Sequence, residues 1–193
     1  KLNVMIDGVI KSYQDNKNNV YLDPVTGKPE PIKGATHLVF SSVGFGEQVQ
    51  ANRGFDVRGH MMRRFKEAGI PAAEVAFRAD FASHAKKEAL FKDMRSGKIK
   101  ILIGSPKNMG TGLNVQRRLK SLHFMSPPWY PADVEQPHGR ILRQGNQNAE
   151  ADIYWYSTKG TYDSTMWNMV ARKSRFIEQA FSGDDSVRTI DDI

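Results

Sequence analysis

The sequence predicts an α/β fold with a mainly parallel sheet and helices on both faces. Short apolar runs, such as Ile99–Ile103 before Gly104, alternate with longer amphipathic segments. Strands separated by helices pair in parallel, because each helix returns the chain to the same edge of the sheet. The length of 193 residues and the 39% hydrophobic content suit one domain with a sizeable core.

Three parts follow from the order of these segments. Residues 1–35 are expected to form an N-terminal helix at Leu2–Tyr13 and then a linker or short hairpin, since Pro and Gly punctuate Asp23–Pro29. Residues 36–181 form the α/β lobe, and residues 182–193 are a polar, acidic tail or linker. The first helix should bury the apolar residues Val4, Met5, Ile6, Val9 and Ile10.

The elements of the lobe are predicted from the spacing of apolar residues and from the residues that typically begin or end helices. Ser83 can cap a helix that Gly97 ends, and Gly69 ends the helix before it. Strands are expected at Thr36–Ser41, Glu74–Arg78, Lys100–Ile103, Ser121–Met125 and Asp152–Tyr156. Helices are expected at Asp56–Ala68, at Ala85–Arg95, around Gln136–Arg143 and at Thr161–Phe181, where Met166, Met169, Phe176 and Ala180 should face inward; Gly44–Gly54 is a loop.

Two segments carry the chemistry. Gly110 and Gly112 follow a predicted strand, so the backbone there can approach a ligand closely and offer N–H groups to phosphate. Arg140 and Arg143 are three residues apart, which places them on one face of a helix, behind Gln136. Two guanidinium groups on one face can clamp a polyphosphate whose charge grows during phosphoryl transfer.

In combination these segments resemble the second RecA-like lobe of a superfamily 2 helicase or translocase of the Snf2-like branch. The resemblance covers residues 36–181 and implies a RecA-like fold, that of P-loop NTPases without the P-loop. His37–Ser42 matches helicase motif IV, Met109–Asn114 matches motif V and Gln136–Gly145 matches motif VI. More narrowly, Gly145–Asn148 and Met166–Phe181 resemble the helicase segment of the large helicase–DNA-methylase fusion proteins of phages and mobile elements.

The resemblance implies a nucleotide cleft shared with another lobe. ATP and Mg²⁺ would be held mainly by the first lobe, since this sequence has neither Gly-x-x-x-x-Gly-Lys-Ser/Thr nor Asp-Glu-x-His. Arg143 would be the arginine finger, and Arg140 would contact phosphate or organise the closed state. Gln136, Gly139, Gly110, Gly112 and Asn114 would line the cleft. The chain, read as a piece of a longer protein, should bind no cofactor tightly and hydrolyse no ATP alone.

On the nucleic-acid side, the resemblance implies contacts with the DNA phosphate backbone without sequence readout. The residues implied are Ser41, Ser42, Ser105, Lys107 and Asn108. The net charge of +7 favours a polyanionic partner, although solubility alone is an alternative. Basic residues crowd this region, namely Lys107, Arg117, Arg118, Lys120, Arg140 and Arg143. For Ser41 and Ser42, capping of the strand end is an equal alternative.

Two other functional classes stay open. Ser126-Pro-Pro-Trp129 resembles the motif with which S-adenosylmethionine-dependent DNA amino-methyltransferases hold a flipped base. Gly44-Phe-Gly46 is a poor companion for it, and motifs V and VI would be unexplained. A non-enzymatic DNA-binding module is the other alternative. Trp129 could stack on a base, but packing beneath the arginine helix is the favoured interpretation.

Composition excludes several classes of site. With no cysteine the chain has no disulfides and no thiolate metal ligands, and its five histidines lack metal-ligand spacing, so no metal is expected. No apolar run approaches the ~18 residues of a membrane span. The expected partners are DNA and a first RecA-like lobe in the same parent chain, with no membrane. The expected location is the cytoplasm, for a protein that is bacterial or phage-encoded.

Overall fold

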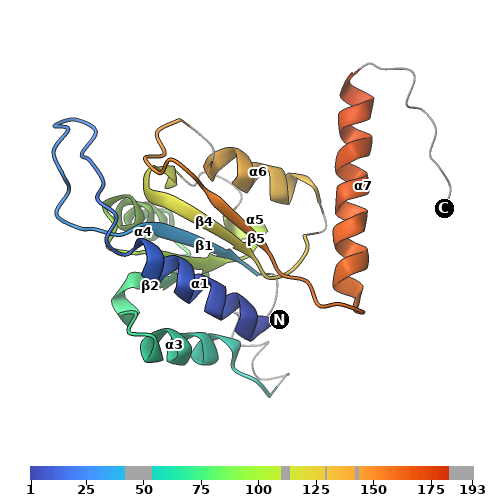
Figure 1. Ribbon diagram of the computed structural model, residues 1–193, viewed down its shortest axis with the longest axis horizontal. Coiled ribbons are helices and arrows are strands. Elements are labelled where there is room, and N and C mark those ends of the chain that lie inside the picture. The colour runs from blue at the N-terminus through green and yellow to red at the C-terminus, as the bar shows by residue number, and fades with distance from the viewer. Residues whose placement is uncertain (42–53, 110–113, 129, 142–143, 183–193) are drawn as a thin grey trace.

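The computed structural model describes residues 1–41, 54–109, 114–128, 130–141 and 144–182. Its centre is a five-stranded sheet in the order β2-β3-β1-β4-β5, and every neighbouring pair is parallel (Figure 1). The strands are β1 (Thr36–Phe40), β2 (Val75–Phe77), β3 (Ile101–Gly104), β4 (Leu119–Phe124) and β5 (Asp152–Trp155). The predicted parallel sheet is therefore confirmed.

Helices cover both faces of this sheet, as predicted. One apolar cluster joins α1 (Leu2–Asn16) and α3 (Val57–Glu67) to one face through Met5, Met61 and Ile101. The other cluster joins α4 (His84–Ser96) and α6 (Ala132–Ile141) to the opposite face through Phe91, Ile141 and Leu122. The other described elements are α5 (Pro106–Met109), the 3₁₀ turns η1 (Ala72–Glu74), η2 (Arg78–Asp80) and η3 (Gln116–Arg118), and α7 (Tyr162–Ser182).

Local signals fixed several helix ends. Ser83 Oγ accepts a hydrogen bond from Lys86 N–H at 3.3 Å and so caps α4, and Gly97 ends that helix with φ +81°. Gly97 also lies against the Arg118 guanidinium, which a Cβ atom would meet at 2.4 Å. Asp56 caps α3 in the same way by accepting from Gly59 N–H at 2.8 Å.

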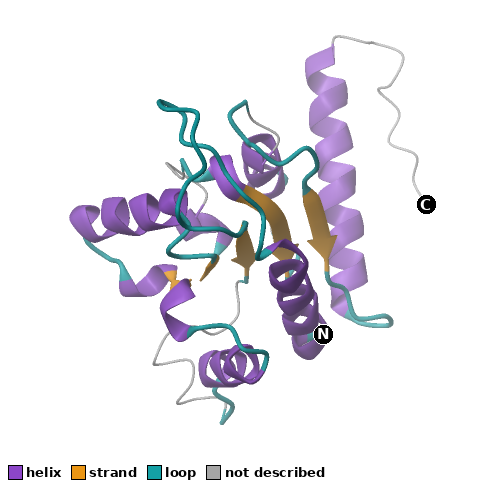
Figure 2. Ribbon diagram, turned by 60° about the vertical axis from the view of Figure 1, so that its left-hand side comes forward, coloured by secondary structure: helices purple, strands orange, loops and turns teal. Residues whose placement is uncertain are grey.

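Two predictions of helix faces were wrong in part. In α1, Met5, Ile6 and Val9 are buried, but Val4 is 63% exposed because it lies on the side of the helix that faces away from this buried stripe. In α7, Met166 and Val170 are buried, whereas Met169 and Phe176 are exposed and the Ala180 side chain lies outside the description. Figures 1 and 2 show α7 beside β5 at the edge of the sheet, so only one narrow stripe of this helix is covered.

The polar segment after α1 forms a hairpin, which we define as residues 17–35. Leu22 and Pro29 form an antiparallel bridge. Its turn is closed by Asp23, whose Oδ1 accepts from Val25 N–H at 2.9 Å and from Thr26 N–H at 2.8 Å. The predicted linker or hairpin is thus a hairpin.

A chain of buried polar groups lies between the sheet and α1. His37 Nδ1 is 2.7 Å from Ser121 Oγ, which is 2.8 Å from His123 Nε2, and His123 Nδ1 is 2.9 Å from the Tyr156 hydroxyl. Burial lowers the pKa of His37 to about 3. Burial, and then the neighbouring His37, lower the pKa of His123 to about 3. Both imidazoles are therefore neutral in the folded protein at ordinary pH.

We expect the free energy of unfolding to fall as the pH drops below 6.5. The unfolded chain takes up protons at histidines with a pKa near 6.5, and the folded chain does not until about pH 3. Stability is thus complete above pH 6.5, and each histidine costs about 2 kcal/mol at pH 5. Urea unfolding between pH 8 and pH 5 measures this slope.

A variant carrying both His37→Asn and His123→Asn should flatten that pH dependence. The exposed His84, replaced by asparagine, provides the matched control and should leave the slope unchanged. An unchanged slope in the double variant would show that the buried histidines do not set it.

Candidate functional site

Three neighbouring strands end side by side at one edge of the sheet. β3 leads into Ser105 and α5, β1 leads into Ser41, and β4 leads into Ser126. Ser41 N–H donates to the Gly104 carbonyl at 2.9 Å, and Met125 N–H donates to the Phe40 carbonyl at 2.9 Å. The carboxyl ends of strands in an open parallel sheet are its usual ligand edge. Motif IV therefore ends at that edge, and the segment that leads into motif V, residues 104–109, begins there.

The segment that leads into motif V begins with a close packing contact at Gly104. A Cβ atom on Gly104 would meet Met109 Cγ and Arg78 Cβ at 2.9 Å each, so glycine lets α5 turn back tightly over the strand end. Ser105 is half-buried, and Lys107 and Asn108 lie on α5, although their side chains fall outside the description. Asn114 is exposed, and its carbonyl accepts from Arg95 Nη1 at 3.1 Å. Gly110 and Gly112 lie outside the described residues, as does Ser42.

The motif VI segment forms α6, which packs against both β4 and α5. Val134, Pro137 and Ile141 are buried and define the inner face of the helix. Gly139 is exposed, with open space where a Cβ atom would stand. Gln136 and Arg140 are also on α6, with side chains outside the description. Arg143 lies just beyond the helix, outside the described residues. The fold thus brings the motif V and motif VI segments into contact.

Ser41 is 1% exposed. Its position at the end of β1 and its backbone hydrogen bond to Gly104 favour the strand-end role over a contact with phosphate. Ser126 is half-buried after β4, and Trp129 lies outside the described residues, so both expectations for that tryptophan are untested.

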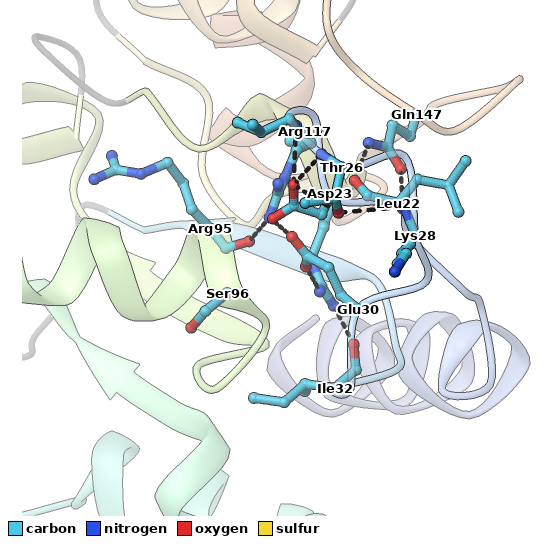
Figure 3. Close-up of polar contacts among 12 residues, drawn as sticks. Leu22, Asp23, Thr26, Lys28, Glu30, Ile32, Arg95, Ser96, Arg117 and Gln147 are labelled. Carbon is cyan, nitrogen blue, oxygen red and sulfur yellow. Dashed lines mark hydrogen bonds and ion pairs between the residues drawn. The ribbon is translucent and has the colours of Figure 1, made fainter.

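Three of the basic residues near the motifs have structural partners. Arg118 is fully buried and pairs with Glu30, and Arg117 Nη2 is 2.5 Å from Glu30 Oε1 (Figure 3). Arg117 also donates to the Arg95 carbonyl at 2.7 Å, and Lys120 Nζ is 3.1 Å from Asp152 Oδ2. Counting these charges as unpaired was therefore wrong: each lies against a carboxylate near the amino end of β4, although Glu30 is shared and balances only one of the two arginine charges.

Sequence reasoning missed the residues that anchor the motif segments. Asn146 Nδ2 donates to the Ile141 carbonyl at 2.7 Å, at the end of α6, and to the Leu119 carbonyl at 2.8 Å, at the start of β4. Gln147 exchanges two hydrogen bonds with the backbone of Leu22 (Figure 3). The only sequence signal was the cluster of amides at Asn146–Asn148, which contributed to the resemblance but suggested no contact.

The part of the chain that the structure describes holds neither a candidate metal centre nor a candidate membrane-spanning helix. Its histidine, aspartate and glutamate side chains gather nowhere in the groups of three that a metal ion requires. None of its helices combines the length and the apolar character needed to cross a bilayer.

Comparisons with known proteins connect this geometry to helicases. The sequence is 32% identical over 117 residues to "Uncharacterized ATP-dependent helicase YqhH" of Bacillus subtilis, a match that covers 61% of this chain and 20% of that protein. It is 35% identical over 108 residues to "DNA repair protein RAD5A" of Arabidopsis thaliana, covering 55% of this chain and 10% of that protein. The chain thus spans a small fraction of the curated relatives it matches.

A third relative comes from a phage. "Defense against restriction protein B" of Escherichia phage P1 is 29% identical over 99 residues, covering 51% of this chain and 4% of that protein. No protein-family model matches the sequence. Among solved structures, the C-terminal part of the Fun30 ATPase domain superimposes with a TM-score of 0.52 at 17% identity, covering 70% of this chain and 39% of that chain. That structural likeness supports the fold.

Proposed function

Because the chain is a C-terminal RecA-like lobe of the Snf2-like helicase type, we propose that it works as the second lobe of an ATP-dependent DNA helicase or translocase. In this proposal ATP lies in a cleft between this chain and a first RecA-like lobe of the same parent protein. The observation that carries the proposal is the contact between α5, which leads into motif V, and α6, which carries motif VI.

On the nucleotide side, this chain would supply charge to a phosphate held elsewhere. Arg143 would stabilise the charge that develops on the γ-phosphate, and Arg140 would contact phosphate or organise the closed state. The lining of the cleft would come from Gln136, Gly139, Gly110, Gly112 and Asn114. The first lobe would hold Mg²⁺ and the remaining phosphates.

On the nucleic-acid side, the proposed contacts lie at the exit of β3 and beyond the end of β1. Ser105, Lys107 and Asn108 would contact the phosphate backbone together with Ser42, while the burial of Ser41 suits it to holding the strand end. Hydroxyl, amide and ammonium groups contact phosphates without reading the bases. The substrate class is therefore DNA recognised through its backbone.

We expect the chain alone to show no DNA-stimulated ATP hydrolysis, and the chain joined to its first lobe to show it. The reason is that a lobe without a phosphate-cradling loop can stabilise the transition state only of a nucleotide bound by its partner. The measurement is phosphate release with and without duplex DNA, at low and physiological salt, since backbone contacts weaken as salt rises. Rapid turnover by the chain alone, lost in Arg143→Ala, would contradict the division of labour between two lobes.

A further inference from the structure

The proposed function leaves the N-terminal hairpin, residues 17–35, without a role, yet polar contacts bind it to the residues that follow each motif segment. Its first attachment is to the residues that follow α6. Leu22 N–H donates to Gln147 Oε1 at 2.8 Å, and Gln147 Nε2 donates to the Leu22 carbonyl at 2.8 Å. A side-chain amide thus pairs with a backbone unit as a neighbouring strand would, using both a donor and an acceptor.

Residues 146–148, which follow α6, make further hydrogen bonds to other parts of the chain. Gln147 N–H donates to the Arg117 carbonyl at 2.9 Å, and the hydroxyl of the buried Tyr21 donates to Asn148 Oδ1 at 2.6 Å. Asn146 joins this segment to the last turn of α6 through the Ile141 carbonyl. The anchored residues flank Arg143 in the sequence: Ile141 is two residues before it, and Asn146 is three residues after it.

The second attachment runs from the hairpin to the end of motif V. Glu30 pairs with Arg117 and Arg118, and Arg117 donates to the Arg95 carbonyl (Figure 3). Arg95 in turn donates to the Asn114 carbonyl at 3.1 Å. One hairpin therefore holds the chain where it leaves motif V and where it leaves motif VI.

We infer that the hairpin is an internal strap that positions the arginine-bearing segment, and that Gln147 is its principal positioning residue. This inference rests on the proposed function. An arginine finger acts only when its guanidinium meets the transferred phosphate, and a misplacement of about 1 Å can cost about 10²-fold in rate. Gln147 touches neither nucleotide nor DNA in this account; it acts through the backbone that carries Arg143.

The test is steady-state ATP hydrolysis by the protein in which this chain is joined to its first lobe. Gln147→Ala should lower kcat by about 10-fold to 100-fold, because both bonds to Leu22 are lost and the segment is held less rigidly by the anchors that remain. The KM for ATP should change by less than about threefold, since the first lobe makes most nucleotide contacts. Gln147→Glu can accept from Leu22 N–H but cannot donate to the Leu22 carbonyl. Its kcat should therefore lie between those of the wild type and Gln147→Ala.

Two other variants separate positioning from loss of stability. Tyr21→Phe keeps the buried ring but loses the bond to Asn148, so it should lower kcat in the same direction by less and guards against failure of Gln147→Ala to fold. Gln14→Ala is the matched control, because it also removes an amide-to-backbone bond, from Gln14 Nε2 to the Ala68 carbonyl at 2.9 Å, between α1 and the end of α3. It should lower the melting temperature without changing kcat.

The outcomes distinguish the two claims. A joined wild-type protein without DNA-stimulated turnover overturns the proposed function and this inference with it. An active wild type that Arg143→Ala inactivates, while Gln147→Ala and Tyr21→Phe keep the wild-type kcat, overturns the strap alone. A fall in kcat that Gln14→Ala reproduces at equal loss of melting temperature also overturns it, since general destabilisation then explains the effect.

Discussion

Arg143→Lys should lower DNA-stimulated ATP hydrolysis by about 10³-fold or more in the protein that joins this chain to its first lobe. Lysine keeps the positive charge and most of the side-chain length. It loses the planar fork with which a guanidinium contacts two phosphate oxygens at once. If the residue is the arginine finger, that geometry matters in the transition state more than in the bound ground state, so kcat should carry the loss and the affinity for ATP should change little.

The comparison needs a control that makes the same change elsewhere. Arg172 is exposed on α7 and belongs to neither motif segment, and Arg172→Lys should keep wild-type turnover. Melting curves of the chain alone complete the experiment, and Arg143→Lys should barely move them. A chain that unfolds on this substitution, while the joined protein keeps its turnover per folded molecule, would show that Arg143 is a structural residue.

Local sequence signals were sufficient for the fold because they specify backbone geometry directly. Ser83 caps α4 with its own side chain, and Gly97 adopts a positive φ that other residues avoid. The apolar runs that became β1 and β3 are buried on both faces, as strands in the middle of a parallel sheet must be. Each of these signals acts within a few residues, so one sequence suffices to read it.

Helix faces were predicted less well because they depend on what lies opposite. Met166, Met169 and Phe176 all fit a helical period in α7, but the helix lies at the edge of the sheet, where only a narrow stripe finds cover. The spacing of apolar residues alone does not predict the width of the buried stripe. The position of β5 as the last strand decides it.

The candidate site likewise has features that local sequence predicts and features that depend on distant residues. The motifs identified the candidate segments, and α5 packs against α6, while the roles of their side chains stay predictions. The charges of Arg117 and Arg118 were misjudged because they were counted against their neighbours in sequence. Their partner, Glu30, is 88 residues from Arg118 on another element, and no local pattern announces such a pair.

That pair leads to the second large effect: Glu30→Ala should destabilise the chain by about 3–5 kcal/mol. The Glu30 side chain is only 12% exposed, and it is the acidic partner of Arg118, which is fully buried. Arg118 would keep its hydrogen bonds to the Ile32 and Gly34 carbonyls and its place over the Tyr21 ring. These dipoles and the ring do not neutralise a full charge that has been removed from water, which is why breaking such a pair costs more than the pair contributes.

Urea unfolding of the chain measures the loss, with Glu67→Ala as the matched control. Glu67 is 60% exposed and its carboxylate is 3.9 Å from Arg64, so its removal should cost at most about 1 kcal/mol. Adding Arg118→Met to Glu30→Ala should recover part of the loss, because the uncompensated charge is then gone while an apolar side chain of similar length fills its place. If Glu30→Ala were as mild as Glu67→Ala, the carbonyl groups around Arg118 would suffice to hold it, and the hairpin would be anchored by Gln147 and Tyr21 rather than by the buried ion pair.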